Sequence, residues 1–91
     1  MFQVLYQEEV VKKDLPKISA YWKDAIKRSI ETKLNSSPEL YGKSLRRSLK
    51  NYRKLRVGDY RVIFRIEGQN VKIFVIGHRS VVYARADKRL R

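Results

Sequence analysis

The chain contains no cysteine, which excludes disulfide bonds and thiolate metal sites. It has no apolar run near the ~20 residues that a membrane-spanning helix requires. Its first residues also lack the basic start and long apolar run of a signal peptide. These absences fit a protein of the reducing cytoplasm. A length of 91 residues predicts one domain over residues 1–91, with one modest core.

Acidic residues are scarce in the second half of the chain. Residues 1–42 hold seven Lys or Arg and six Asp or Glu, whereas residues 43–91 hold fifteen and three. The second half therefore carries a net charge of +12 out of the total of +13. Such asymmetry predicts a polyanionic partner. Nucleic acid fits better than an anionic membrane, because the basic half lacks an amphipathic basic helix. A basic surface without a dedicated ligand is the remaining alternative.

The first half is expected to be mainly helical. Residues 2–6 alternate as a short strand, and residues 8–13 are expected to form a turn or two of helix. Asp14 is the expected N-cap of a longer helix, with Pro16 in its first turn. Apolar residues recur every four positions in that helix: Ile18, Trp22, Ile26, Ile30 and Leu34. The pattern indicates an amphipathic helix that ends near Asn35.

The second half is expected to form mainly strands. Residues 39–50 show no regular pattern, and three leucines in them are interpreted as inward anchors: Leu40, Leu45 and Leu49. Three strands are expected at about residues 51–57, 60–67 and 70–77. Residues 83–91 are expected to form a short C-terminal helix or a frayed basic tail. The order of strand, two helices, three-strand antiparallel meander and C-terminal helix predicts an α+β domain.

Two tight turns fix the pairing of the three strands. A turn at Gly58-Asp59 places Arg56 opposite Arg61, and a turn at Gly68-Gln69 places Val62 opposite Val75. One face of the meander then becomes almost continuously apolar. The other face carries six basic or titratable side chains: Lys54, Arg56, Arg61, Arg65, Lys72 and His78. Like charges directly across a strand pair are destabilising, so the Arg56–Arg61 pair predicts an anion between them.

The cationic face is expected to stay open, because the helices need the apolar face. Basic groups would hold phosphates there, and aromatic rings would stack on unpaired bases of RNA. The rings expected to do so are Tyr52, Tyr60, Phe74 and Tyr83. The residues expected to contact RNA are Arg47, Lys50, Arg53, Arg56, Arg65 and Lys72.

Two segments resemble the RelE/ParE superfamily of bacterial and archaeal toxins, and more closely its RelE branch. They are Leu-Arg-Val-Gly-Asp-Tyr-Arg-Val-Ile-Phe-Arg-Ile at 55–66 and Val-Ile-Gly-His-Arg-Ser-Val-Val-Tyr at 75–83. The resemblance implies a small RelE-like domain and the toxin of a type II toxin–antitoxin system. Such a toxin enters the ribosome and cuts mRNA without a metal or other cofactor. The 2′-hydroxyl of the RNA attacks the adjacent phosphate and leaves a 2′,3′-cyclic phosphate.

The resemblance also implies roles for particular residues. Lys54 falls on a catalytic lysine, and Tyr83 falls on a C-terminal catalytic tyrosine. Arg61 falls on a phosphate-binding arginine, and Arg79 on a second arginine. His78 joins them on chemical grounds, because histidine side chains exchange protons near neutral pH. Some members carry a second lysine where this chain has Tyr52.

Two other functions stay open at this point. A ParE-like toxin would poison DNA gyrase by protein contact and would need no catalytic residues. A catalytically inactive module would only bind nucleic acid. The set Lys54, Arg61, Arg79 and Tyr83 favours the RNA-cleaving function. Ribosome and mRNA are then the expected targets, and an acidic antitoxin is expected to cross the basic face or to pack beside the C-terminal element.

Overall fold

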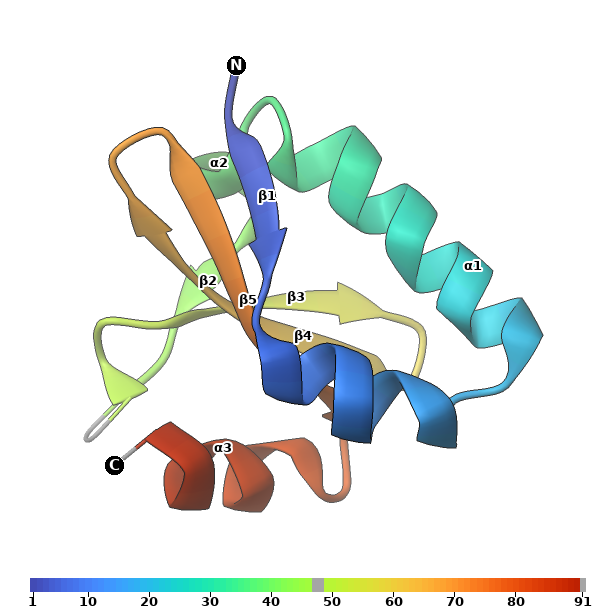
Figure 1. The fold of residues 1–91 in the computed structure, drawn as a ribbon. Helices are drawn as coiled ribbons and strands as arrows, with labels where there is room; N and C mark the ends of the chain where they lie inside the picture. The colour runs from blue at the N-terminus through green and yellow to red at the C-terminus, as the bar shows by residue number, and fades with distance from the viewer. Residues whose placement is uncertain (47–48, 91) are drawn as a thin grey trace.

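The computed structural model describes residues 1–46 and 49–90. Its centre is a five-stranded mixed sheet in the order β1-β5-β4-β3-β2 (Figure 1). The strands are β1 (Gln3–Tyr6), β2 (Lys43–Ser44), β3 (Arg53–Val57), β4 (Tyr60–Glu67) and β5 (Asn70–His78). β1 pairs with β5 in parallel, and the other neighbours are antiparallel. The predicted α+β order of strand, helices, meander and C-terminal helix is confirmed.

The helices before the meander differ in detail from the prediction. The chain forms a wide helical turn η1 (Val10–Asp14) and a tight turn η2 (Leu15–Lys17) before α1 (Ala20–Ser29). A further wide turn, η3 (Ile30–Leu34), continues α1, so the predicted end near Asn35 is confirmed. The cap of α1 is Ser19, whose Oγ accepts from the Trp22 N–H at 3.5 Å.

The predicted cap is at another element: Asp14 holds the N-cap position of η2, with Pro16 in its first turn, and not that of α1, and its side chain makes no cap hydrogen bond. Asp14 stands before η2, its side chain is 1% exposed, and it accepts the Ile76 backbone N–H at 2.9 Å. It also binds Arg89, which lies 75 positions along the chain. A buried carboxylate needs charged or hydrogen-bonding partners, and here these come from the sheet and the C-terminal helix rather than from a helix end.

The leucine predictions hold in part. Leu40 lies in α2 (Pro38–Tyr41) and is 76% exposed, so its assignment as an inward anchor was wrong. Pro38 faces inward in this single turn, and a residue two positions further along a helix points away from it. Leu49 is buried and Leu45 packs against it in part, so both anchors are confirmed.

The predicted register is correct for the β3–β4 hairpin and fails at a bulge in the β4–β5 hairpin. Arg56 pairs with Arg61 as predicted. A bulge between Ile63 and Phe64 then changes the second hairpin, so that Val62 pairs with Ile76 and not with Val75. Val75 pairs with Ile63 instead, on the face that carries Arg61. Successive strand residues point to opposite faces, so one extra residue transfers the end of β5 to the other face.

The sheet therefore has an apolar core on each face. α1 and η3 cover the larger core, which includes Ile26, Ile30 and Phe64. The second core contains Leu49, Ile63, Val75, Val82 and Ala86, and α3 (Val82–Leu90) covers it. Figure 1 shows α1 and α3 on different sides of the sheet. The expectation that the cationic face stays open was thus wrong for the middle of that face. Ile63 and Val75 are buried there beneath α3, so charged groups lie at the two ends of the face. In the described part of the chain, no helix is long and apolar enough to span a membrane.

Candidate functional site

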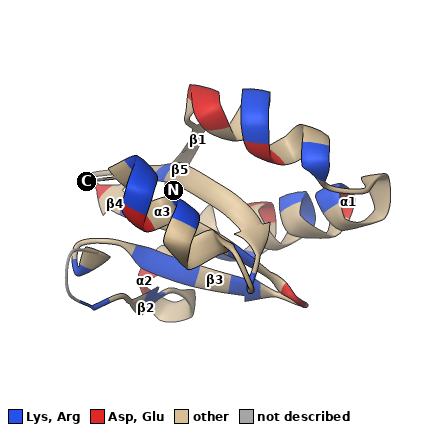
Figure 2. Ribbon diagram, turned by 90° about the horizontal axis from the view of Figure 1, so that it is seen from below, with Lys and Arg blue, Asp and Glu red and all other residues tan. Residues whose placement is uncertain are grey.

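A hollow of about 430 Å³ brings together the five residues predicted to be catalytic. Its lining consists of Lys54, Arg61, His78, Arg79, Ser80 and Tyr83, and we call it the larger hollow. β3 supplies the lysine, β4 the first arginine, the end of β5 and the following turn supply residues 78–80, and the start of α3 supplies the tyrosine. Lys and Arg line β3 and α3 on this side of the molecule (Figure 2).

The two arginines of the larger hollow are held by the turn between β3 and β4. Arg61 Nη1 donates to the carbonyl oxygens of Gly58 at 3.0 Å and Tyr60 at 2.9 Å. Arg79 donates its backbone N–H to the Asp59 carbonyl at 2.8 Å, and its Nε lies 3.5 Å from Asp59 Oδ1. The side chains of Arg79 and Asp59 are 63% and 66% exposed, so their ion pair is weak. Arg61 is thus oriented by neutral carbonyls, and no carboxylate among the described residues forms an ion pair with it.

Lys54 and Tyr83 are in contact across the larger hollow. Lys54 Nζ lies 5.5 Å from the centroid of the Tyr83 ring, at a distance typical of a cation–π contact. Tyr83 also packs against the second core, so part of its ring has a structural role. The contact fixes the lysine amine beside the ring of the residue whose hydroxyl is a candidate proton donor.

His78 reaches the larger hollow from a different strand face than predicted. The bulge places it opposite Tyr60, and the two rings form an edge contact with centroids 5.8 Å apart. The sequence prediction that His78 shares the strand face of Arg61 was therefore wrong, although the strand end brings its ring to the same hollow. His78 Nδ1 accepts the Ser80 backbone N–H at 3.1 Å. A neutral ring then carries its proton on Nε2 and presents a donor.

A smaller hollow of about 220 Å³ adjoins the larger one and shares Lys54 and Arg61 with it. Its remaining lining residues are Tyr41, Lys43 and Arg56. Lys43 was missed by the sequence prediction, because β2 has two residues and no alternating pattern that marks it as a strand. Its pairing with Lys54 could not be predicted without that strand.

The far end of the same sheet face is partly neutralised by the chain itself. Arg65 pairs with Lys72 across the strands, and Glu67 lies between them. Glu67 Oε1 is 2.8 Å from Lys72 Nζ, and Glu67 Oε2 accepts from Arg65 Nε at 2.5 Å. Hydrogen bonds from Lys72 and then from Arg65 lower the pKa of Glu67. Arg65 also donates to the Tyr52 hydroxyl at 3.0 Å. Arg65 and Lys72 therefore do not join Lys54 and Arg61.

Most of the other residues expected to contact RNA lie away from the two hollows. Arg53 pairs with Phe64, so it is on the face of the larger core, and its Nη1 donates to the Gly42 carbonyl at 3.0 Å. Lys50 is exposed and lines a separate polar hollow beside Arg53. Arg47 lies outside the described residues. Of the six residues in this group, Arg56 alone lines either of the two hollows, as far as residues 1–46 and 49–90 are concerned.

The aromatic rings expected to stack on bases are mostly used for packing. Tyr52 and Phe74 form an edge contact with centroids 5.3 Å apart, and Arg65 lies over both rings. Tyr60 packs against Trp22, with a centroid separation of 5.5 Å. Tyr41 is 49% exposed at the smaller hollow, although no sequence pattern marked it as a stacking residue. Among the described residues, no group of three or more His, Cys, Asp or Glu could hold a metal ion.

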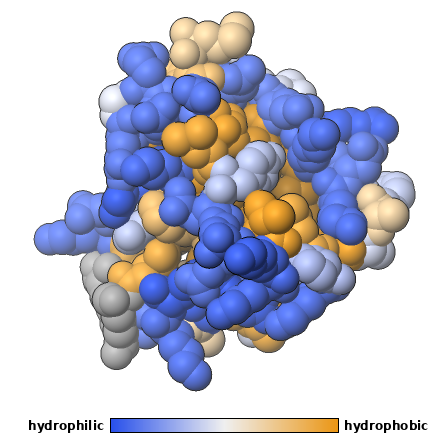
Figure 3. Space-filling model, in the orientation of Figure 1, coloured by the Kyte–Doolittle hydropathy of each residue, from blue (hydrophilic) through white to orange (hydrophobic). Residues whose placement is uncertain are grey.

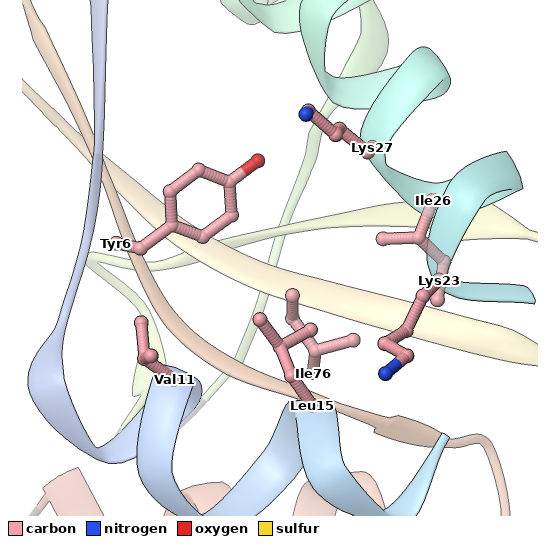
Figure 4. Close-up of a pocket in the computed structure, with 7 residues that line it drawn as sticks. All are labelled: Tyr6, Val11, Leu15, Lys23, Ile26, Lys27 and Ile76. Atoms are coloured by element: carbon pink, nitrogen blue, oxygen red, sulfur yellow. The ribbon is translucent and has the colours of Figure 1, made fainter. Parts of the chain in front are cut away.

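A third hollow, of about 310 Å³, has a different chemical character. Its lining is mainly apolar and comes from η1, η2, α1, β1 and β5: Tyr6, Val11, Leu15, Lys23, Ile26, Lys27 and Ile76 (Figure 4). In the view of Figure 3, apolar side chains are exposed between hydrophilic surroundings in the middle of the molecule. Burial and then the charge of Glu31 raise the pKa of Tyr6. This lining suits an apolar contact rather than proton transfer.

Residues 5–83 match a family model described as the ParE toxin of type II toxin–antitoxin system, parDE. The RelBE2 toxin–antitoxin complex from Mycobacterium tuberculosis contains a similar chain, with 28% identity, a TM-score of 0.79, and coverage of 87% of this chain and 92% of that chain. The RelB–RelE antitoxin–toxin complex from Methanococcus jannaschii gives 28% identity, a TM-score of 0.69, and coverage of 89% and 96%.

A mutant of the Escherichia coli toxin RelE, in complex with an antitoxin RelB peptide, gives 20% identity and a TM-score of 0.66, with coverage of 93% of each chain. This likeness concerns the fold alone. No curated protein sequence gives a significant match.

Proposed function

The chain belongs to the ParE toxin family of type II toxin–antitoxin systems, within the RelE/ParE superfamily, and we propose that it is a ribosome-dependent mRNA endonuclease. The observation that carries this proposal is the larger hollow, where a lysine, two arginines, a histidine and a tyrosine meet from β3, β4, the end of β5 and α3. Together these groups can supply the base, the fixed positive charges and the proton donor that metal-free cleavage of RNA needs. The toxin would act in the cytoplasm, where its ribosome and mRNA targets are found.

The reaction we propose begins with the 2′-hydroxyl of the nucleotide before the cut. Its oxygen bonds to the adjacent phosphorus while its proton passes to the neutral amine of Lys54. The bond between phosphorus and the 5′-oxygen breaks, and the hydroxyl of Tyr83 gives that oxygen a proton. The products are a 2′,3′-cyclic phosphate and a 5′-hydroxyl. No metal or other cofactor takes part in this scheme.

Charge that grows on the phosphate during the reaction needs fixed donors. Arg61 is suited to this role because the carbonyls of Gly58 and Tyr60 hold one end of its guanidinium, and its other donors can bind phosphate oxygens. Arg79 adds a second, more exposed guanidinium. His78 presents an N–H when neutral, so we assign it a hydrogen bond to the phosphate rather than the role of base.

A second function is favoured by the family model itself, because that model describes ParE toxins. A ParE-like toxin would inhibit DNA gyrase by protein contact. One pair of assays separates the two functions. Primer extension on ribosome-bound message would reveal cuts within codons if the chain is an endonuclease, and a gyrase supercoiling assay would stay unaffected. Inhibited supercoiling without cuts in the message would overturn the proposal and indicate a gyrase-inhibiting toxin. Binding of nucleic acid with neither effect would indicate a catalytically inactive module.

An acidic antitoxin is the partner we propose. The chains from M. tuberculosis and M. jannaschii were both solved as toxin–antitoxin complexes. Lys54, Arg56 and Arg61 form no ion pair with any described carboxylate, so they offer an acidic segment a binding surface, and covering them would block access of RNA. Co-purification of the chain expressed from its native operon tests this expectation. Recovery of the toxin without a small acidic protein would contradict it.

A further inference from the structure

The smaller hollow contains two pairs of like charges that face each other across strands. Lys43 of β2 pairs with Lys54 of β3, and Arg56 of β3 pairs with Arg61 of β4. All four side chains line one hollow of about 220 Å³. Residues directly opposite in an antiparallel pair have Cβ atoms about 4.5–5.5 Å apart, where like charges destabilise the sheet. Four cations on three neighbouring strands therefore create a strong local positive potential.

The same sheet contains a third cationic pair, which differs from the other two because a carboxylate binds it. Arg65 and Lys72 also face each other, but Glu67 binds both of them. Among residues 1–46 and 49–90, no carboxylate lies within ion-pair distance of the four cations in the smaller hollow. One cross-strand pair is thus partly compensated by a carboxylate of the chain, and the other two pairs are not. This contrast indicates that an external anion compensates the second set.

The position of the smaller hollow identifies the anion. It shares Lys54 and Arg61 with the larger hollow, where the phosphate to be cleaved is proposed to bind. An anion in the smaller hollow therefore lies next to that phosphate. We propose that Lys43 and Arg56 bind the neighbouring phosphate of the same RNA strand, an inference that rests on the proposed function. Tyr41, half exposed at the rim, offers its ring to the attached base.

Binding of a non-cleavable RNA strand tests this second phosphate site without the ribosome or the reaction. The probe is a fluorescent single-stranded 2′-O-methyl oligonucleotide, and anisotropy is measured over a range of salt concentrations. For single strands, the slope of log K against log salt is about −0.7 for each phosphate contact. The double variant Lys43→Ala/Arg56→Ala should make the slope shallower by about 0.7, because both side chains are assigned to the same phosphate, and each single variant should show part of that change. Lys72→Ala is the matched control, because its ammonium is already bound by Glu67, and it should leave the slope unchanged.

The result that overturns the proposal is an unchanged slope in both variants while their thermal unfolding shows an intact fold. If the two variants lose binding of the acidic antitoxin but keep that slope, the hollow belongs to the protein partner and the proposal is also overturned. Failure of the proposed function looks different, since message would then stay uncut even by the wild-type chain. In cleavage assays the two variants should raise KM and leave kcat within about threefold, as expected for contacts away from the reacting atoms.

Discussion

Arg89→Ala should be the most destabilising single substitution in the C-terminal helix. Arg89 donates two hydrogen bonds to Asp14, from Nη1 to Oδ2 at 2.9 Å and from Nη2 to Oδ1 at 3.0 Å. Its Nη1 also donates to the Phe74 carbonyl at 3.0 Å. The side chains of Arg89 and Asp14 are 11% and 1% exposed, so solvent screens this pair little. Its hydrogen bonds to Asp14 raise the pKa of Arg89, which keeps the guanidinium charged.

The magnitude follows from what the substitution leaves behind. Removing one partner of a buried ion pair costs about 3–5 kcal/mol, because the remaining charge stays buried without that partner. Asp14 would keep the Ile76 N–H and Arg85, whose Nη1 lies 3.8 Å from Asp14 Oδ1, so the loss should fall at the lower end of this range. The free energy of unfolding of a small domain is about 5–15 kcal/mol, so this loss is a large fraction of it. In the double variant Asp14→Asn/Arg89→Met neither charge of this pair remains, and part of the loss should be recovered.

Urea unfolding followed by circular dichroism measures the loss. Lys88→Ala is the control on the same helix, because its side chain is exposed, and it should change the free energy of unfolding by less than about 0.5 kcal/mol. Arg89→Ala should also slow cleavage, since α3 carries Tyr83 into the larger hollow. A loss below about 1 kcal/mol, typical of an exposed ion pair, would show that the Asp14–Arg89 contact does not stabilise the fold as a buried ion pair.

Two further predictions concern Glu67 and the hairpin turns. Because the pKa of Glu67 is lowered, its contribution to stability is present above the unfolded pKa of about 4.3 and is lost as pH falls through the folded pKa. Glu67→Gln should remove that part of the dependence of the free energy of unfolding on acid pH. An unchanged dependence would contradict the prediction. Gly58→Ala should destabilise more than Gly68→Ala, although φ is +60° and +62° respectively, because a Cβ at Gly58 would lie 2.4 Å from Trp22 whereas the space around Gly68 is open. Thermal unfolding compares the stability of the two variants. Equal losses of stability would show that the Trp22 side chain can move away from the new Cβ without destabilising the fold.

The sequence predicts local pairing well and non-local pairing poorly. The turn at Gly58-Asp59 was sufficient to predict the Arg56–Arg61 pair, because a two-residue turn fixes the register of its hairpin. The bulge after Ile63 could not be predicted, since β5 is uninterruptedly apolar from residue 73 to 76 and no polar residue marks its faces. That bulge moved His78 away from the strand face assigned to it.

The remaining errors have the same origin in contacts between distant parts of the chain. Asp14 has the sequence context of a helix cap, and only the folded chain brings Arg89 to it. Lys43 lies in a segment without periodicity, and its place beside Lys54 depends on a two-residue strand. The convergence of Lys54, Arg61 and the turn after β5 could be expected from the hairpins together with the family resemblance.

The most direct test of the proposed site is the rate of message cleavage by Arg61→Ala. The rate is measured in single turnover on a ribosome programmed with a defined codon, and the protein's intact fold is checked by circular dichroism. Loss of one donor that stabilises the transition state lowers rates by about 10²–10³, and Arg61→Ala should show a loss of that size. Lys12 is the control, because it is an exposed lysine of η1 that pairs with Glu8. The variant Lys12→Ala should cleave message at the wild-type rate. Cleavage by Arg61→Ala at the wild-type rate would contradict a phosphate-binding role for the larger hollow.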